Sequence, residues 1–599
     1  MGELVIGIVA QVGNNVDSLC SDITGWLKER DYKAETIRLS EFITPKKYAN
    51  EYDRIEGMQE QGNSLRRESQ CNHILSLCAI GKIASTRSNK EDALEKKAFI
   101  IRSLKRPEEI EVLRSVYGSA FVCIGVHTSL ESRKNFLLDQ NKTGLEPMEA
   151  GARALRIIDR DETESNYYGQ RTRDAYELCD AFVRWSFAVP VFKGLDRVLK
   201  LLFGSVFTTP SMDEYGMFLA HSASYRSADL GRQVGAAVLT DRGDVLAATC
   251  NEVPRHGGGQ FWEGDKDDQR DFKFGEDPNE KMKNKILDRI SEIFDEIQTE
   301  QSLGSVGQMP LSTPEARRER LKQSGILDIT EYGRSVHAEM ECLLSCARNG
   351  ITPKGATLYT TTFPCHNCAR HIISAGIKRV VYVEPYPKSK ALQLHNSEIA
   401  LPLTEVDWDG QLEVPSQEGD KVKFEPFVGI GPHKYADWFS MKTMTGKRIE
   451  RKEGGRPIHE VSTSLIELKS PESNLSYLDR EIIAIDQLWK LADKTHFSQM
   501  KDEIATVLSN TADLVKKAES LRTPIEWRES KAIEDWRDEQ IPLDLATETE
   551  TPLTSGDRTL PSRAKERSRS AKTKKEMRSS SDDLEKHPVT EESIQKPVS

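Results

Sequence analysis

Two short motifs in the middle of the chain contain side chains that bind transition metals. The sequence reads HAE at 337–339 and PCHNC at 364–368. One imidazole and two thiolates suit zinc, and three protein ligands leave the fourth tetrahedral position open for water, as in catalytic sites. The motifs therefore predict a catalytic zinc ion (Zn2+) held by His337, Cys365 and Cys368.

Each motif is predicted to open a helix, and these helices must bring the ligands together. The helical segments are SVHAEMECLLSCARNG and HNCARHIISAGI, and the strand GATLYTT fits between them. Cys365 and Cys368 are three residues apart on a first helical turn, so their side chains point the same way. A helix N-terminus also favours the thiolate form that binds metal.

Glu339 is the predicted proton carrier of this site. Zinc lowers the pKa of water toward about 7. A carboxylate two residues from a ligand reaches that water without binding the metal, takes its proton and passes it to a ring nitrogen and a departing ammonia. The pattern H-x-E…P-C-x-x-C is typical of zinc deaminases, so the motifs predict hydrolytic removal of an amino group from a pyrimidine.

The other cysteines and histidines near the motifs are not expected to bind the metal. C-x-x-C alone also occurs in redox pairs and structural zinc sites, but no second C-x-x-C is present to complete four thiolates. Cys342 and Cys346 lie one helical turn apart among apolar residues and are interpreted as core residues. His366 and His371 are interpreted as exposed residues of the second helix.

Three further residues are candidate substrate contacts. Asn251, in CNEVP, follows a strand and is either a contact to ribose or base or a turn residue. Arg226 and Arg232, in RSADLGRQVGA, are either phosphate contacts or surface residues.

Composition limits the class of substrate and the compartment. The formal net charge of the 599 residues is -11, which favours a small-molecule substrate over a long nucleic acid. The ten cysteines form no framework of pairs, and neither a basic leader nor an apolar run of about 20 residues is present. We therefore expect a cytoplasmic protein without a membrane-spanning segment.

The pattern of strands and helices predicts an α/β protein with four parts. Residues 1–195 alternate strands and helices, which implies a parallel, helix-covered sheet. Residues 205–445 predict a three-layer α/β/α domain with an insertion at 255–330, whose amphipathic helix suggests regulation or a subunit contact. Residues 446–545 are a helical extension, and 546–599 are a disordered tail.

Longer segments resemble a known family. PCHNCARHIISAGIKRVVYV resembles the deoxycytidylate deaminase branch of the cytidine deaminases, and IIRSLKRPEEIEVLRSVYG, NEVPRHGGGQFW and FEPFVGIGPHKYADWF resemble bacterial antiphage dCTP/dCMP deaminases. This resemblance implies a P-loop kinase-like N-terminal domain, free dCMP and dCTP as substrates, and depletion of the dCTP pool. It supports the roles of His337, Cys365, Cys368, Glu339 and Asn251. A homo-oligomer and a small RNA or nucleotide regulator are also expected.

The N-terminal domain departs from a working phosphate loop. In IGIVAQVGNNVDS the loop residues are Gly13, Asn14 and Asn15, while Val16 and Asp17 stand where Lys and a hydroxyl residue would be. Without that charge and hydroxyl, phosphoryl transfer is not expected. The domain is therefore predicted to have a kinase-like fold and either a regulatory or a purely structural role.

Two other functions use the same motifs. A deaminase acting on cytosine or adenine in single-stranded nucleic acid needs a basic groove with aromatic residues, and only the tail beyond 560 is basic. A non-catalytic, nucleotide-sensing zinc protein would keep the metal without needing Glu339.

Overall fold

The structure is a computed structural model in which residues 1–530 form one compact unit. It describes residues 3–517 except for 44–46, 88–95, 141–146, 165, 186–191, 276, 303–331, 386–388, 402–420, 443–447, 458–476 and 496–502. The predicted tail at 546–599 lies outside the described residues.

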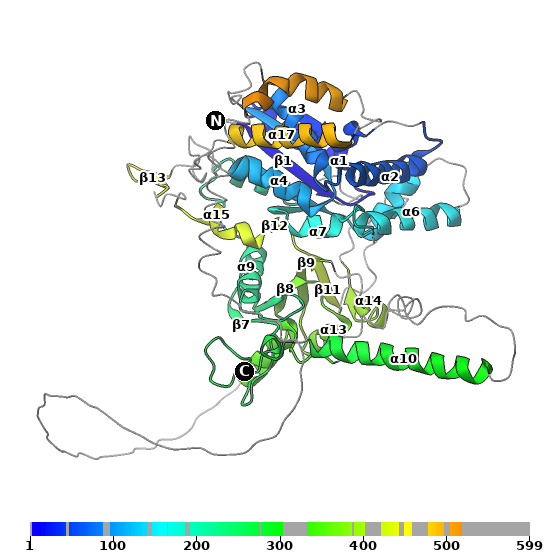
Figure 1. Ribbon diagram of the computed structural model, residues 1–599. Coiled ribbons are helices and arrows are strands. Elements are labelled where there is room, and N and C mark those ends of the chain that lie inside the picture. The colour runs from blue at the N-terminus through cyan, green and yellow to red at the C-terminus, as the bar shows by residue number, and fades with distance from the viewer. Residues whose placement is uncertain are drawn as a thin grey trace, which may run out of the picture. The chain divides into compact units, whose positions relative to one another are not determined.

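The N-terminal part contains a sheet with the order β12-β5-β4-β1-β3-β2 (Figure 1). All neighbours are parallel except β12, which pairs antiparallel with β5. The strands are β1 (Leu4–Ala10), β2 (Lys33–Arg38), β3 (Lys97–Leu104), β4 (Phe121–His127), β5 (Ala181–Arg184) and β12 (Gly429–Ile430). The predicted parallel α/β fold is confirmed.

Both faces of this sheet are buried because the side chains of β1 alternate between two cores. Val5 and Val9 pack in one core with α3 (Ile74–Ser85) and α4 (Pro107–Tyr117). Leu4, Ile6 and Ile8 pack in the other core with α1 (Val16–Lys28) and α8 (Leu195–Leu202). Strands buried on both faces are nearly continuous apolar runs, which explains how sequence alone revealed β1, β3 and β4.

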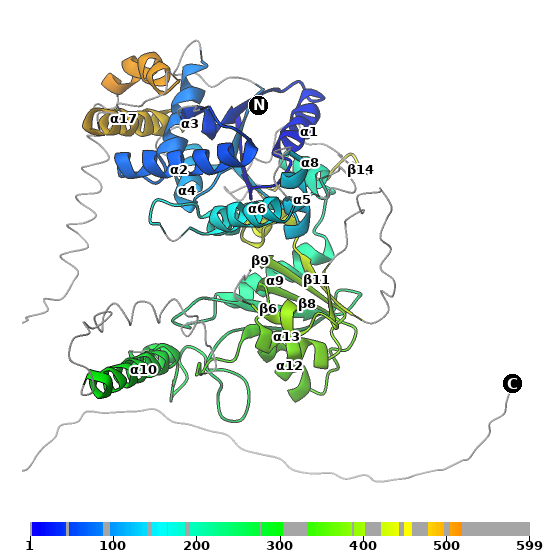
Figure 2. The same cartoon turned by 90° about the vertical axis from the view of Figure 1, so that its right-hand side faces the viewer.

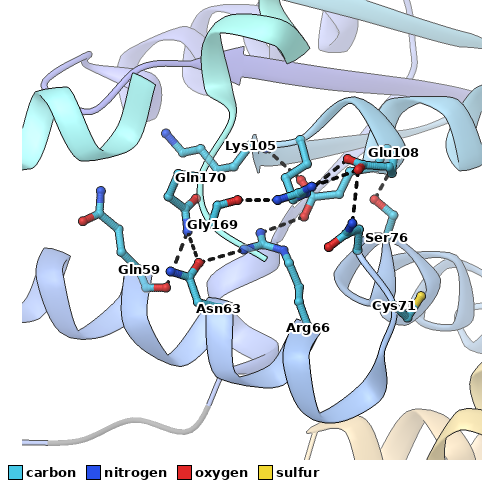
Figure 3. A network of polar contacts seen from close by, with 12 residues as sticks. Gln59, Asn63, Arg66, Cys71, Ser76, Lys105, Glu108, Gly169 and Gln170 are labelled. Carbon is cyan, nitrogen blue, oxygen red and sulfur yellow. Dashed lines mark hydrogen bonds and ion pairs between the residues drawn. The ribbon is translucent and has the colours of Figure 1, made fainter. Parts of the chain in front are cut away.

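A buried polar network lies beneath the ends of these strands (Figure 3). Arg66 of α2 (Glu51–Ser69) donates to Glu109 at 3.0 Å and to the Asn63 side chain at 3.4 Å. Gln170 donates to the same Asn63 oxygen at 3.0 Å, and Glu109 accepts from the Lys105 backbone at 2.7 Å. The network thus ties residues 105 and 170, from distant parts of the chain, to one helix.

The helical extension packs on the N-terminal part. Its helix α17 (Tyr477–Thr495) lies beside α3, as Figure 1 shows, and residues 503–517 are also helical. Arg87 lies between Glu3 and Glu481 of α17, and the three side chains are at most 2% exposed. A fully buried ion triad therefore joins α17 to the start of β1.

The second sheet has the order β10-β11-β9-β8-β6-β7. Helices α12 (Ala338–Arg348) and α13 (His366–Ser374) pack on one face (Figure 2), and α9 (Met212–Ser224) packs on the other. This is the predicted three-layer arrangement, with Cys342 and Cys346 fully buried in its core. The strands are β6 (Gly235–Leu239), β7 (Val245–Cys250), β8 (Thr357–Thr362), β9 (Arg379–Glu384), β10 (Ile399–Ala400) and β11 (Val422–Pro426).

The two sheets are joined through α9 and β12. Glu214 of α9 is fully buried, pairs with Arg197 and accepts from the Ile430 backbone at 3.0 Å. Since Ile430 belongs to β12, a short strand that follows the second sheet in the chain completes the edge of the first sheet.

The insertion contains the predicted helix, α10 (Pro278–Ser302). Leu287 is buried, whereas Met282, Ile293 and Phe294 are between 37% and 44% exposed. Among the described residues, the apolar stripe is therefore only partly covered. In the part of the chain that the structure describes, no helix combines the length and apolar character that crossing a membrane requires.

Candidate functional site

The structure brings the three predicted ligands together at two helix starts. His337 is the N-cap of α12, and Cys365 is the N-cap of α13 with Cys368 in its first turn. Nδ1 of His337 lies 3.3 Å from Sγ of Cys368 and 3.4 Å from Sγ of Cys365. All three donor atoms lie within 4.8 Å of one another, so they can share one ion.

The donor set suits zinc in its chemistry as well as its geometry. Hydrogen bonding with Cys368 lowers the pKa of the Cys365 thiol to about 4. The hydrogen bond with Cys365 raises the pKa of His337 to about 9. Two sulfurs and one nitrogen fit a zinc site that keeps a fourth position open, and binding of the ion would release the protons held by these side chains.

Glu339 points into the same site. It is 4% exposed, and one of its carboxylate oxygens lies 3.5 Å from Sγ of Cys368. Burial raises the pKa of Glu339. Glu339 also lines a cavity of about 440 Å³ together with His337 and Cys365. The cavity is within the size range of small-molecule sites, so a ligand inside it can reach both the carboxylate and the metal ligands.

Of the predicted substrate contacts, Asn251 and Arg232 line the cavity. The Asn251 amide is also structural, because it donates to the Arg232 carbonyl at 2.9 Å and accepts from the Val234 backbone at 2.8 Å. Arg226 is not among the lining residues. Its guanidinium lies 4.2 Å from the ring centre of Trp262 and donates to Gln260.

Other lining residues were not predicted from the sequence. They include Phe363, Arg334, and Arg173 from the N-terminal part. Arg334 is held by Asp271 at 2.6 Å. Phe363 follows β8 directly and precedes the metal motif, which is a usable sequence signal. Arg173 has no local signal, because its place depends on how the two sheets are joined.

The predicted phosphate loop borders a separate cavity of about 310 Å³ in the N-terminal part. Gly13 has φ +91°, and a Cβ there would lie 2.6 Å from the Arg133 carbonyl oxygen, so glycine is required. Asn15 caps α1 by accepting from Ser18, while Asn14 donates to the Gln11 carbonyl at 2.8 Å. The asparagine side chains thus hold the loop itself.

Residues 210–384 match the family model of the cytidine and deoxycytidylate deaminase zinc-binding region. The match includes the His337, Cys365 and Cys368 cluster. Residues 210–384 therefore match the zinc-binding region of this family, and the predicted His/Cys/Cys zinc-binding site is confirmed.

Relatives with known names align with parts of this domain. Deoxycytidylate deaminase of Enterobacteria phage T2 is 49% identical over 55 residues, covering 9% of this chain and 29% of the relative. ComE operon protein 2 of Bacillus subtilis (strain 168) is 34% identical over 101 residues, covering 17% and 53%. The chain thus spans about half or less of their lengths. A crystal structure of dCMP deaminase from the cyanophage S-TIM5 in complex with dCMP and dUMP is 19% identical, with a TM-score of 0.18, covering 32% of this chain and 93% of that one.

Proposed function

We propose that this protein hydrolyses free deoxycytidine nucleotides, dCMP and dCTP, to deoxyuridine nucleotides and ammonia. The observation that carries the proposal is the convergence of Glu339 and three metal-binding atoms on one cavity. The relatives named deoxycytidylate deaminase and the net charge of -11 support a free nucleotide as the substrate.

In the proposed reaction, Glu339 moves the protons. A zinc ion held by His337, Cys365 and Cys368 supplies Lewis-acid chemistry that makes water nucleophilic at neutral pH. The water oxygen adds to C4 of cytosine while the Glu339 carboxylate accepts one water proton and delivers it to ring N3. The second water proton goes to the exocyclic nitrogen, the C4–N bond breaks, and ammonia leaves. Asn251 and Arg232, both at the cavity wall, orient the nucleotide.

The test is ammonia release from dCMP, dCTP, dCDP, deoxycytidine and a single-stranded cytosine oligonucleotide. We expect the free nucleotides to react fastest. Glu339→Gln should lower kcat by about 10²–10⁴-fold, the usual contribution of a general acid–base, while zinc content stays unchanged. Faster reaction of the oligonucleotide would indicate a nucleic-acid deaminase, and an unaffected Glu339→Gln variant would exclude the proposed role.

Glu341 provides a matched control. It is a buried carboxylate on the same helix, paired with Arg348 at 2.5 Å and outside the cavity lining. Glu341→Gln therefore tests whether a lower kcat in Glu339→Gln results from damage to α12. We expect Glu341→Gln to keep both zinc and turnover.

We further propose that the reaction depletes dCTP during phage infection. The resemblance of NEVPRHGGGQFW and FEPFVGIGPHKYADWF to the antiphage deaminases supports this output. Cells expressing the wild-type chain should lose dCTP and resist phage after infection, whereas cells expressing Glu339→Gln should do neither. Equal plaque counts on both strains would contradict it.

A further inference from the structure

The short helix α7 (Thr172–Glu177) belongs to the N-terminal part but also contacts the deaminase sheet. It packs against β1 and against β9. Tyr176 anchors the helix in the buried core, with its ring centre 5.0 Å from that of Phe182. Because β9 ends at Glu384, α7 lies next to the strand end that borders the catalytic cavity.

The segment leading into α7 is held in place by the polar network of Figure 3. Arg106 donates to the carbonyl of Gly169 at 2.5 Å, and Gln170 donates to Asn63. The Arg171 backbone donates to the Lys105 carbonyl at 3.0 Å. The start of α7 is therefore held by these contacts, and the direction of Arg173, the second residue of the helix, is fixed with it.

Arg173 extends from this helix into the wall of the cavity that contains His337 and Glu339. Its ion pair among the described residues is with Asp174, at 3.6 Å, and its side chain is 26% exposed. By contrast, Arg334 in the same wall is already paired with Asp271 at 2.6 Å. With respect to the described residues, Arg173 thus keeps hydrogen-bond donors available for a ligand.

A second guanidinium lies near the same carboxylate. Arg232 contacts Glu384 at 3.2 Å and is 55% exposed, and Glu384 also accepts from Thr362 at 2.7 Å. Burial raises the pKa of Glu384, while the charges of Arg232 and Arg173 oppose that rise. Both guanidiniums therefore act on one carboxylate, at the end of β9 and next in the chain to the lining residue Pro385. The other charged lining residues, besides Glu339 and the metal-binding side chains, are Arg334, already paired, and three aspartates, Asp229, Asp271 and Asp277.

We propose that Arg173 and Arg232 together bind the phosphate of the substrate, so that the N-terminal part completes the active site. The inference rests on the proposed function and identifies the substrate as a nucleotide rather than a nucleoside. Guanidinium groups bind phosphate through paired, charge-assisted hydrogen bonds, and one from α7 and one from the segment before β6 clamp it. The aspartates repel phosphate from the rest of the cavity wall.

The test compares kcat/KM for dCMP and for deoxycytidine in Arg173→Ala, Arg173→Lys and the wild type. Loss of a charge-assisted contact predicts that Arg173→Ala lowers kcat/KM for dCMP by about 10–100-fold, while deoxycytidine changes less than about twofold. Arg173→Lys keeps the charge without the paired donors, so its kcat/KM for dCMP should lie between those of Arg173→Ala and the wild type. Arg171→Ala, on the same segment but outside the cavity lining, should match the wild type for both.

Equal losses for dCMP and deoxycytidine, or no loss for either, would overturn the proposal. Failure of the proposed function is a different result, in which the wild type releases ammonia from neither compound. In that case the phosphate site is tested by measuring the affinity of the zinc-loaded protein for dCMP. Weaker binding in Arg173→Ala supports the phosphate site, whereas unchanged or absent binding of dCMP overturns it.

Discussion

Replacing Arg87 with methionine should loosen α17 from the N-terminal part. Arg87 donates four hydrogen bonds, two to Glu3 at 2.8 and 2.5 Å and two to Glu481 at 2.5 and 3.0 Å. The substitution leaves two buried carboxylates without a counter-charge, which costs about 3–5 kcal/mol. Amide hydrogen exchange in α17 should therefore accelerate by about 10²–10⁴-fold, while exchange in α12 stays unchanged.

The cost should depend on pH and on the partner carboxylates. Burial already raises the pKa of Glu481, and loss of Arg87 removes the charge that opposes this rise. The protonated form of Glu481 is then favoured in the folded protein. Arg87→Met should therefore lower the free energy of unfolding less near pH 5 than near pH 8. The triple variant Glu3→Leu, Arg87→Met, Glu481→Leu should recover most of the stability that Arg87→Met loses, because apolar side chains need no counter-charge. Unchanged exchange in Arg87→Met, or a triple variant less protected than Arg87→Met, would refute this reasoning.

Three further predictions concern the deaminase domain and its contact with α7. Burial and the nearby Glu384 raise the pKa of Glu177 from 4.5 to about 8, so folding binds a proton and stability falls as pH rises between these values. Glu177→Gln should raise stability near pH 7 by up to about 3 kcal/mol and flatten this dependence in thermal unfolding; an unchanged pH profile would contradict it. A Cβ on Gly235 would lie 1.9 Å from the Ala220 backbone oxygen. Gly235→Ala should therefore destabilise β6 by about 3 kcal/mol, as measured by amide hydrogen exchange. Unchanged protection of β6 in this variant would disprove the clash. Cys365→Ser should lose zinc to a competing chelator at lower concentrations than the wild type, and equal retention would exclude Cys365 as a ligand.

The metal-binding residues were predictable because their geometry is local. His337 and Cys365 each cap a helix, and Cys368 follows within one turn, so spacing along the chain determines the direction of each side chain. The strands β1, β3 and β4 of the first sheet were equally visible, since burial on both faces makes them continuous apolar runs, whereas β2 (KAETIR) is largely polar and was not predicted.

The rest of the site depends on contacts between distant segments. Arg173 reaches the cavity because buried contacts hold the segment before α7 and because that helix packs on β9. Arg226 and Arg232 are six residues apart and looked equivalent in sequence, but Arg226 is held over Trp262 while Arg232 lines the cavity. Such differences arise from tertiary packing, which local patterns do not encode.

The most direct test of the central claim is to measure zinc, ammonia and dUMP in one preparation incubated with dCMP. We predict one zinc ion per chain, equal amounts of ammonia and dUMP, loss of both products on chelation, and their return when zinc is restored. Full turnover in the chelated protein, or bound zinc without any product, would contradict the assignment of His337, Cys365, Cys368 and Glu339 to catalysis.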